Sequence, residues 1–152
     1  MVMNYDYSSS NGTIYITSGG EDANEQHFRF IHTGNGKYKI EITHANGGVM
    51  NCYCDLPVTN GAKVTAMRSS DNDTQRFYVK PMGDGTYVLM SASVPGLAVT
   101  ATSADFHAAL AILPYDESNR LQRWSFSPNP AITTTIVTTT AKPTTTTTTK
   151  IT

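Results

Sequence analysis

Charged residues are scarce in this chain of 152 residues, and no long apolar run occurs. Charged side chains make up 15% of it, against about a quarter in a typical globular protein. Of the 11 basic residues, Lys142 and Lys150 lie near the C-terminus, so the remainder of the chain has nine basic and 12 acidic residues, a net charge of −3. A nucleic-acid partner would need a basic stripe and a membrane span a much longer apolar run, so neither partner is expected.

Cysteine is nearly absent as well. Cys52 and Cys54 are two residues apart, so on a strand both point to one face, and a bridge between such close neighbours would be strained. No other pair has the spacing of zinc ligands. We expect two small apolar residues in a half-buried strand, and neither a metal nor another cofactor.

The common signatures of catalysis are also missing. The sequence contains no nucleophile elbow, no His-Glu-x-x-His, no phosphate loop and no dinucleotide fingerprint. The histidines show no paired spacing. These absences favour a protein that binds rather than an enzyme.

A change in composition divides the chain. From Ala131 onward threonine runs dominate, at 133–135, 138–140 and 144–149. Such a segment buries too little apolar area to offset its ordering entropy. We therefore expect a folded domain over residues 1–130 and a disordered threonine-rich linker to a neighbouring domain over 131–152. One alternative stays open: Ala131–Val137, with Ile132 and Ile136, could add a strand to the domain.

The expected domain contains three similar units. A glutamine followed two residues later by a large ring recurs at intervals of 49 and 47 residues, and a Gly-x-Tyr segment precedes its second and third copies. The copies are Gln26-His27-Phe28, Gln75-Arg76-Phe77 and Gln122-Arg123-Trp124. We expect the rings to meet in one core and the glutamines mainly to bind main chain at sharp turns.

Short alternating segments between glycine and Asx turns predict strands and no amphipathic helix. The predicted strands include 37–42, 49–54, 62–67, 77–79, 87–90 and 108–113, the last of which would also suit a helical turn. Gly34-Asn35-Gly36 and Gly83-Asp84-Gly85 are predicted hairpin turns. Four short strands per unit, three times over, predict an all-β, closed three-fold barrel.

These features resemble the ricin B-chain type of β-trefoil lectin, also called family 13 carbohydrate-binding modules, over about residues 1–128. The resemblance implies one shallow sugar site per unit. In that family an Asp on a Leu-Asp-Val-like strand, an aromatic residue on the third strand and an Asn before the motif glutamine form the site. Polar groups would bind vicinal hydroxyls while a ring packs on the apolar face of the sugar.

Applied to this chain, the resemblance predicts a set of sugar-binding residues. It also shows several positions at which this sequence differs from the family pattern. The predicted sugar-binding residues are Asn4, Asp6, Tyr15, Thr17, Glu25, Gln26, Asn51, Thr65 and Gln75. The first unit is the best candidate, with Asp6 replacing a missing carboxylate. The second unit lacks a ring unless Tyr53 supplies one. The third unit has no polar anchor and is expected not to bind, because its matching residues are Ala98, Ala111, Leu113 and Leu121.

The leading hypothesis is a carbohydrate-binding module that tethers a secreted protein, such as a glycoside hydrolase, to a glycan. Met1-Val2-Met3 leads straight into Asn-Tyr-Asp, so no leader is visible; we expect that it was removed or that the chain is an excised piece. Two alternatives are a degenerate trefoil used for protein contact or as a spacer, and a protease inhibitor using the loop 103–107.

One strand is missing from the predicted barrel. The family has twelve strands and the sequence predicts eleven, because no Gly-x-Tyr strand precedes Val2. Either the first strand is truncated or 131–137 takes its place. An unfilled gap would leave an exposed strand edge.

Overall fold

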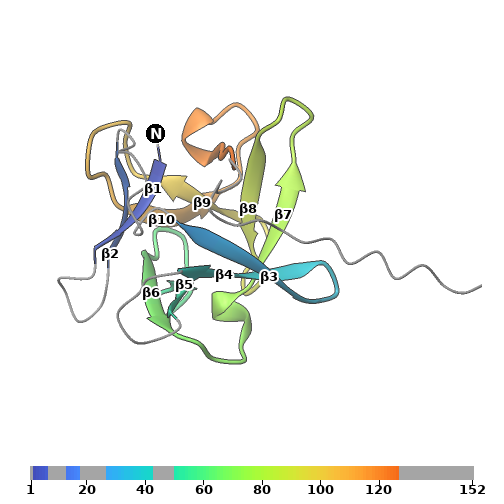
Figure 1. Cartoon of the computed structure of the whole chain (residues 1–152). Helices are drawn as coiled ribbons and strands as arrows, with labels where there is room; N and C mark the ends of the chain where they lie inside the picture. The colour runs from blue at the N-terminus through green and yellow to red at the C-terminus, as the bar shows by residue number, and fades with distance from the viewer. Residues whose placement is uncertain (1, 7–12, 18–26, 43–49, 127–152) are drawn as a thin grey trace, which may run out of the picture.

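The computed structural model describes residues 2–6, 13–17, 27–42 and 50–126. These residues form short β-strands joined by turns, with two single-turn 3-10 helices (Figure 1). The strands are β1 (Val2–Asp6), β2 (Thr13–Thr17), β3 (Phe28–Gly34), β4 (Lys37–Ile42), β5 (Met50–Cys54), β6 (Val64–Arg68), β7 (Phe77–Pro81), β8 (Tyr87–Ser91), β9 (Leu97–Ala101) and β10 (Leu110–Pro114). The helices are η2 (Asp73–Gln75) and η3 (Arg120–Gln122). The all-β prediction is confirmed.

The predicted strand positions agree closely with those observed. The segment 37–42 is β4 with the same bounds, and the others shift by two residues or fewer at their described ends. The ambiguous segment 108–113 is strand β10 (Leu110–Pro114), paired along its whole length with β9. Residue 49 lies outside the described residues. Period-two alternation and turn residues were therefore sufficient to locate these strands.

The strands follow a three-fold plan. They form one connected sheet in the order β1-β2-β6-β5-β4-β7-β8-β9-β10, with β3 paired to β4. Each unit contributes one equivalent hairpin, which is β1–β2 in the first unit, β5–β6 in the second and β9–β10 in the third. Successive units are joined by two further hairpins, β3–β4 and β7–β8. Of the last barrel strand, the described residues, which end at Phe126, contain one bridge, Trp124 with Tyr87. This plan is a β-trefoil.

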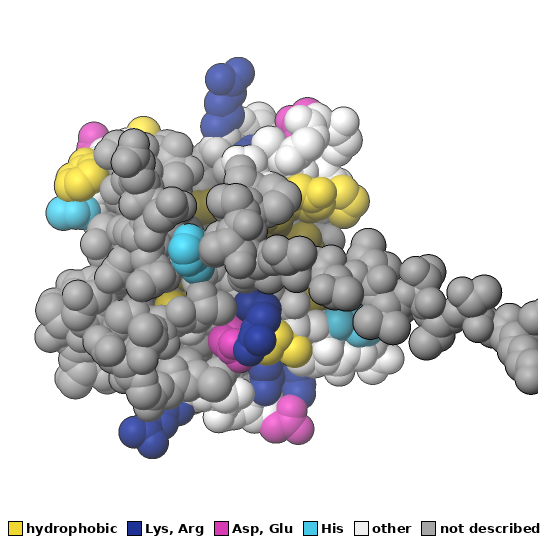
Figure 2. All heavy atoms as spheres, in the orientation of Figure 1, with side chains coloured by type: hydrophobic (Ala, Val, Ile, Leu, Met, Phe, Trp, Pro, Cys, Tyr) yellow, Lys and Arg dark blue, Asp and Glu magenta, His cyan; other side chains and the backbone are white. Residues whose placement is uncertain are grey.

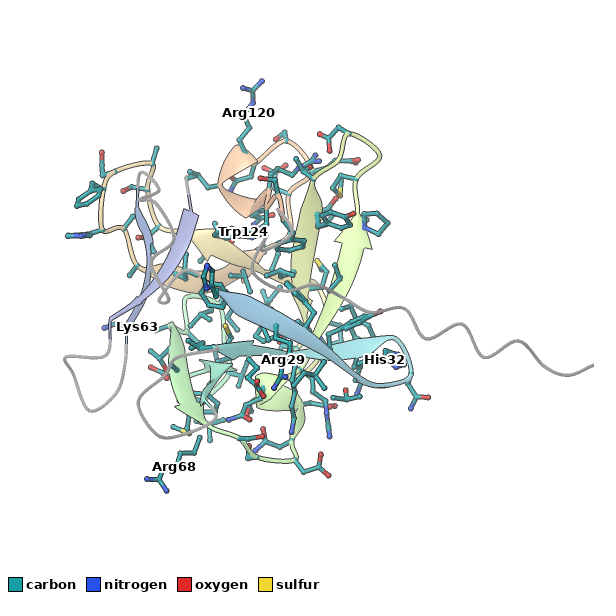
Figure 3. All side chains as sticks on the ribbon, in the orientation of Figure 1. Arg29, His32, Lys63, Arg68, Arg120 and Trp124 are labelled. Atoms are coloured by element: carbon teal, nitrogen blue, oxygen red, sulfur yellow. The ribbon has the colours of Figure 1, made fainter. Side chains whose placement is uncertain are left out.

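A single core holds the units together. Phe77 is fully buried, Trp124 is nearly so, and Phe28 packs against the same cluster, as the repeat predicted. Trp124 is labelled in Figure 3. Its indole Nε1 donates to the carbonyl of Val99 at 3.2 Å, so its one polar group is satisfied. Burying one such large side chain typically stabilises a fold by about 1.5–3 kcal/mol.

The two cysteines belong to this core. Cys52 and Cys54 are both free and buried on β5, as expected for small apolar residues. Burial raises the pKa of Cys54 to about 12, and burial raises the pKa of Cys52 as well. Both therefore stay protonated at neutral pH, and a neutral thiol is a poor nucleophile and metal ligand.

Glycine allows the two tight turns between units. Gly34 and Gly36 have φ of 96° and 72°, and Gly83 and Gly85 both have φ of 83°, a region that residues with a Cβ rarely adopt. Between the last two, Asp84 accepts a hydrogen bond from the Thr86 amide at 2.9 Å. Both predicted hairpin turns are confirmed.

Figure 2 shows how the charged side chains are distributed on one face. In this view the Lys and Arg side chains stand at the top, the centre and the lower edge, and they form no continuous stripe. Several are paired with carboxylates, among them Arg29 with Glu41 and Lys37 with Asp73.

Candidate functional site

The first hairpin brings together two residues of the predicted site. Asn4 on β1 lies directly opposite Tyr15 on β2, and Asp6 lies opposite Thr13. Residues opposite each other in an antiparallel pair share a face, as do residues two apart on one strand. The backbone therefore places Asn4, Asp6, Tyr15 and Thr17 on one face of the β1–β2 ribbon. Glu25 and Gln26 lie outside the described residues.

The strand register of the first hairpin differs in one respect from the register that its alignment with the second hairpin predicts. Aligning the first two repeats in the sequence places Asn4 at the position of Asn51, and Thr17 at the position of Met67. In the structure Asn51 lies opposite Met67, whereas Thr17 lies opposite Val2. Register depends on strand pairing and turn geometry, which residue types alone do not specify. Because the difference is two residues, Asn4 stays on the same face.

The first and second hairpins meet at a pair of threonines. Thr13 of β2 pairs with Thr65 of β6, and Thr65 lies opposite Tyr53 of β5. One row of residues therefore crosses the four strands in the order Asp6, Thr13, Thr65, Tyr53. Neighbouring strands are about 4.8 Å apart, so the backbone places this row of residues from the two hairpins on one continuous face of the sheet.

Asp55 is a carboxylate of this surface that the sequence analysis missed. It follows β5 directly, and its backbone amide donates to the carbonyl of Lys63 at 2.9 Å. Its Oδ1 accepts a hydrogen bond from Oγ1 of Thr65 at 2.8 Å, and both residues are half-buried. The available signal was an aspartate directly after a predicted strand, two residues beyond Tyr53, which lies opposite Thr65. The pair supplies a hydroxyl and a carboxylate, both groups that sugars bind.

Tyr53 does not supply the missing ring of the second unit. It is buried, with 7% of its surface exposed, so it presents no open ring face. Met67 is the exposed residue on this face of β6, at 43%. The second hairpin therefore has polar groups without an exposed aromatic ring.

The motif glutamines Gln75 and Gln122 make hydrogen bonds to the main chain of the turns. Gln75 is fully buried; its Nε2 donates to the carbonyl of Arg68 and its Oε1 accepts from the amide of Ser70, both at 2.7 Å. Gln122 makes the matching bonds to the carbonyl of Pro114 at 2.9 Å and the amide of Asp116 at 3.0 Å. We therefore keep Gln75 as a structural residue and leave it out of the proposed site.

The third hairpin presents apolar residues at the matching positions. Ala98 is fully buried and lies opposite Leu113 on β10. Ala111 is buried, and Leu121 packs against the core. Thr100 follows Ala98 by two residues on β9, but it is buried and accepts a hydrogen bond from Gln122. At the positions that match the predicted sugar-binding residues, the third hairpin therefore offers no exposed polar group with which to bind a hydroxyl.

No cluster suited to metal binding is present among the described residues. They hold no group of three His, Cys, Asp or Glu side chains placed to share a metal ion. The clearest electrostatic feature is Asp73, whose pKa is lowered by hydrogen bonds from Lys37 and Arg76. It joins η2 to β4 at 2.7 Å, which makes it a structural group. None of the helices within these same residues could span a membrane.

Comparison with known proteins agrees with the β-trefoil fold. A family model described as "Ricin-type beta-trefoil lectin domain-like" matches residues 24–113. No curated protein matches the sequence. Among solved structures, the designed 3-fold symmetric protein ThreeFoil is similar with a TM-score of 0.67 and 24% identity, covering 81% of this chain and 87% of that one.

Two further similar structures are much longer chains. A mosquitocidal holotoxin has a TM-score of 0.66 and 16% identity over 84% of this chain and 15% of its own. Cry35Ab1 has a TM-score of 0.63 and 20% identity over 98% of this chain and 36% of its own. At these identities the likeness shows the fold alone.

Proposed function

This chain belongs to the ricin-type β-trefoil lectin domain-like family, and we propose that it binds carbohydrate and thereby tethers an attached, secreted protein to a glycan. The domain itself performs no chemistry in this proposal. The threonine-rich segment after Ala131 supplies the covalent connection to the neighbour. A neighbour that degrades polysaccharide would gain most, because it would be held near its substrate.

The observation that carries the proposal is the pairing of Asn4 with Tyr15. An amide can bind two neighbouring hydroxyls of a sugar, and an aromatic ring can pack on its apolar face. The two groups must lie on one face and within reach of one ligand, and directly opposite residues meet both conditions. Asp6 adds a carboxylate on the same face.

The second hairpin extends this site. Through the Thr13–Thr65 pair, the Asp55–Thr65 hydrogen bond lies next to the first hairpin. A ligand longer than one sugar could therefore contact both hairpins in succession. The apolar third hairpin has no place in the site.

Affinity for a single sugar should be weak. A shallow open site typically gives a dissociation constant near 1 mM, about −4 kcal/mol. Contacts over two hairpins, or attachment to a protein that carries several such modules, would raise the effective affinity. An anchoring role is compatible with weak, reversible binding.

The test is a glycan array followed by calorimetry on the best ligand. Asn4→Ala and Tyr15→Ala should each weaken binding about tenfold or more, since each removes about 1.4 kcal/mol or more of contact energy. Asp55→Asn should weaken binding of an oligosaccharide more than that of a monosaccharide. The matched control is Leu113→Ala on the third hairpin, which should leave binding unchanged. Failure of the wild-type chain to bind any glycan would refute the proposal.

A second candidate function is protein contact. Leu56 and Phe106, in the loops of the second and third hairpins, are 68% and 62% exposed. Large apolar side chains mark a contact surface where they gather in a contiguous exposed patch. Binding of a protein partner that is lost in Phe106→Ser and retained in Asn4→Ala would favour this function over carbohydrate binding.

A further inference from the structure

A row of residues crosses the outer face of the sheet beside the second hairpin. The strands β3, β4, β5 and β6 each contribute one residue, and each residue lies opposite the next in an antiparallel pair. In strand order the row is Arg29, Glu41, Asn51 and Met67. The neighbours of Glu41 on β4, Ile40 and Ile42, belong to the core. Because successive side chains on a strand point to opposite faces, the row lies on the outer face.

Glu41 is a buried carboxylate in this outward-facing row. The residue is 6% exposed. Its Oε1 accepts a hydrogen bond from Nη2 of Arg29, whose side chain is 61% exposed and is labelled in Figure 3. The other carboxylate oxygen, Oε2, accepts no hydrogen bond within the part of the chain that the structure describes. A buried carboxylate with one partner costs free energy unless a further group binds it.

The corresponding row beside the third hairpin shows that the fold does not require this charge. Tyr78 takes the place of Arg29, since each comes one residue after the ring of its repeat motif. Met90 takes the place of Glu41, since each comes thirteen residues after that ring. Tyr78 and Met90 lie opposite each other, as Arg29 and Glu41 do. Apolar residues thus fill the same two places in the same fold, and such a replacement of a buried ion pair is often neutral or stabilising.

The ion pair lies next to residues that the proposed site already contains. Glu41 is directly opposite Asn51, so the two Cα atoms are about 4.5–5.5 Å apart. Met67, the exposed residue of the row, is two residues from Thr65 on β6 and shares its face. Thr65 donates to Asp55. A continuous surface therefore leads from Arg29 and Glu41 to the hydrogen bond between Thr65 and Asp55.

We propose that Glu41 and Arg29 are the polar centre of a sugar subsite on the second hairpin, which binds two neighbouring hydroxyls of a neutral sugar. The carboxylate accepts from one hydroxyl, and an N–H of the guanidinium donates to the next. Met67 contacts the apolar CH groups of the sugar. The pair has no net charge and Asp55 lies on the same face, so an acidic sugar is disfavoured. This inference rests on the proposed function and adds two binding residues to it.

The first test removes the charge and keeps the shape. The probes are cellotetraose, xylotetraose and mannotetraose, titrated calorimetrically into the full chain. Glu41→Gln should weaken binding of the preferred tetrasaccharide about tenfold or more, because it replaces a charged acceptor by a neutral amide. The matched control is Glu117→Gln, an exposed carboxylate in the loop after β10, which makes the same change in net charge and should leave binding unchanged.

The outcomes separate this inference from the proposed function. Binding that weakens in Asn4→Ala and stays at the wild-type level in Glu41→Gln would overturn the subsite and leave the function standing. Equal weakening in Glu41→Gln and Glu117→Gln would assign the effect to net charge and would also overturn the subsite. A wild-type chain that binds none of the three tetrasaccharides would overturn it as well.

The second test asks whether the ion pair is needed for stability. The full chain with both Arg29→Leu and Glu41→Met has apolar residues at both places, as in the row beside the third hairpin. Its melting temperature should fall by less than about 5 °C, or rise, while binding of the same tetrasaccharide weakens about tenfold or more. A larger fall would show that the pair is present to stabilise the fold. Either that result or unchanged binding would overturn the proposal.

Discussion

At the scale of the residue, hydrogen bonds to the main chain explain why the motif glutamine recurs in the interior of an apolar core. Gln122 is fully buried and makes three hydrogen bonds, with the carbonyl of Pro114, the amide of Asp116 and the hydroxyl of Thr100. An amide offers donors and an acceptor from one group. The same side chain can therefore bind both a carbonyl and an amide of the chain where it leaves the third strand of the unit.

Replacing this amide should lower the stability of the fold. Gln122→Ala removes all three hydrogen bonds of a fully buried side chain and should lower the free energy of unfolding by about 2–4 kcal/mol. Arg120→Ala, in the same short helix but with an exposed side chain, is the control and should change it by less than about 0.5 kcal/mol. Urea titrations measure both. Similar values for the two variants would show that the glutamine bonds contribute little.

At the scale of the element, ion pairs join the turn before β7 to the strand β4. The carboxylate of Asp73 binds Lys37 at 2.7 Å and Arg76 at 3.1 Å. These contacts, the one with Lys37 first, hold the pKa of Asp73 below its ordinary value of 3.8. A carboxyl with a lowered pKa contributes stability above its ordinary pKa and loses it as pH falls toward the folded pKa.

The contribution of Asp73 should therefore depend on pH in one direction. At pH 7, Asp73→Asn should lower the free energy of unfolding by no more than about 1 kcal/mol, because the group is partly exposed. The difference from wild type should shrink as pH falls below about 4. Urea titrations at pH 7, 4 and 2.5 measure it, and Lys37→Met should reproduce most of the effect. A difference that stays constant with pH would contradict the assignment.

At the scale of the whole molecule, the units share one core and so should not unfold separately. Phe77 from the second unit, Trp124 from the third and Phe28 from the first contact the same cluster. Small domains with one contiguous core usually unfold in a single transition. Trp124 fluorescence and far-ultraviolet circular dichroism should therefore report coincident midpoints in urea, within about 0.2 M. Two separated midpoints would show that the third unit is an independent folding unit.

The sequence by itself determined the fold class, the strand positions, the three-fold period and the structural role of the glutamines. These depend on local alternation, turn residues and repetition, which one chain displays without its tertiary contacts. Only the tertiary structure decided which side chains share a surface. It paired Asn4 with Tyr15, joined Thr13 to Thr65, brought Asp55 beside Thr65 and buried Tyr53. Strand register and contacts between units depend on pairing across long stretches of chain, and a change of two residues leaves the alternation pattern unaltered.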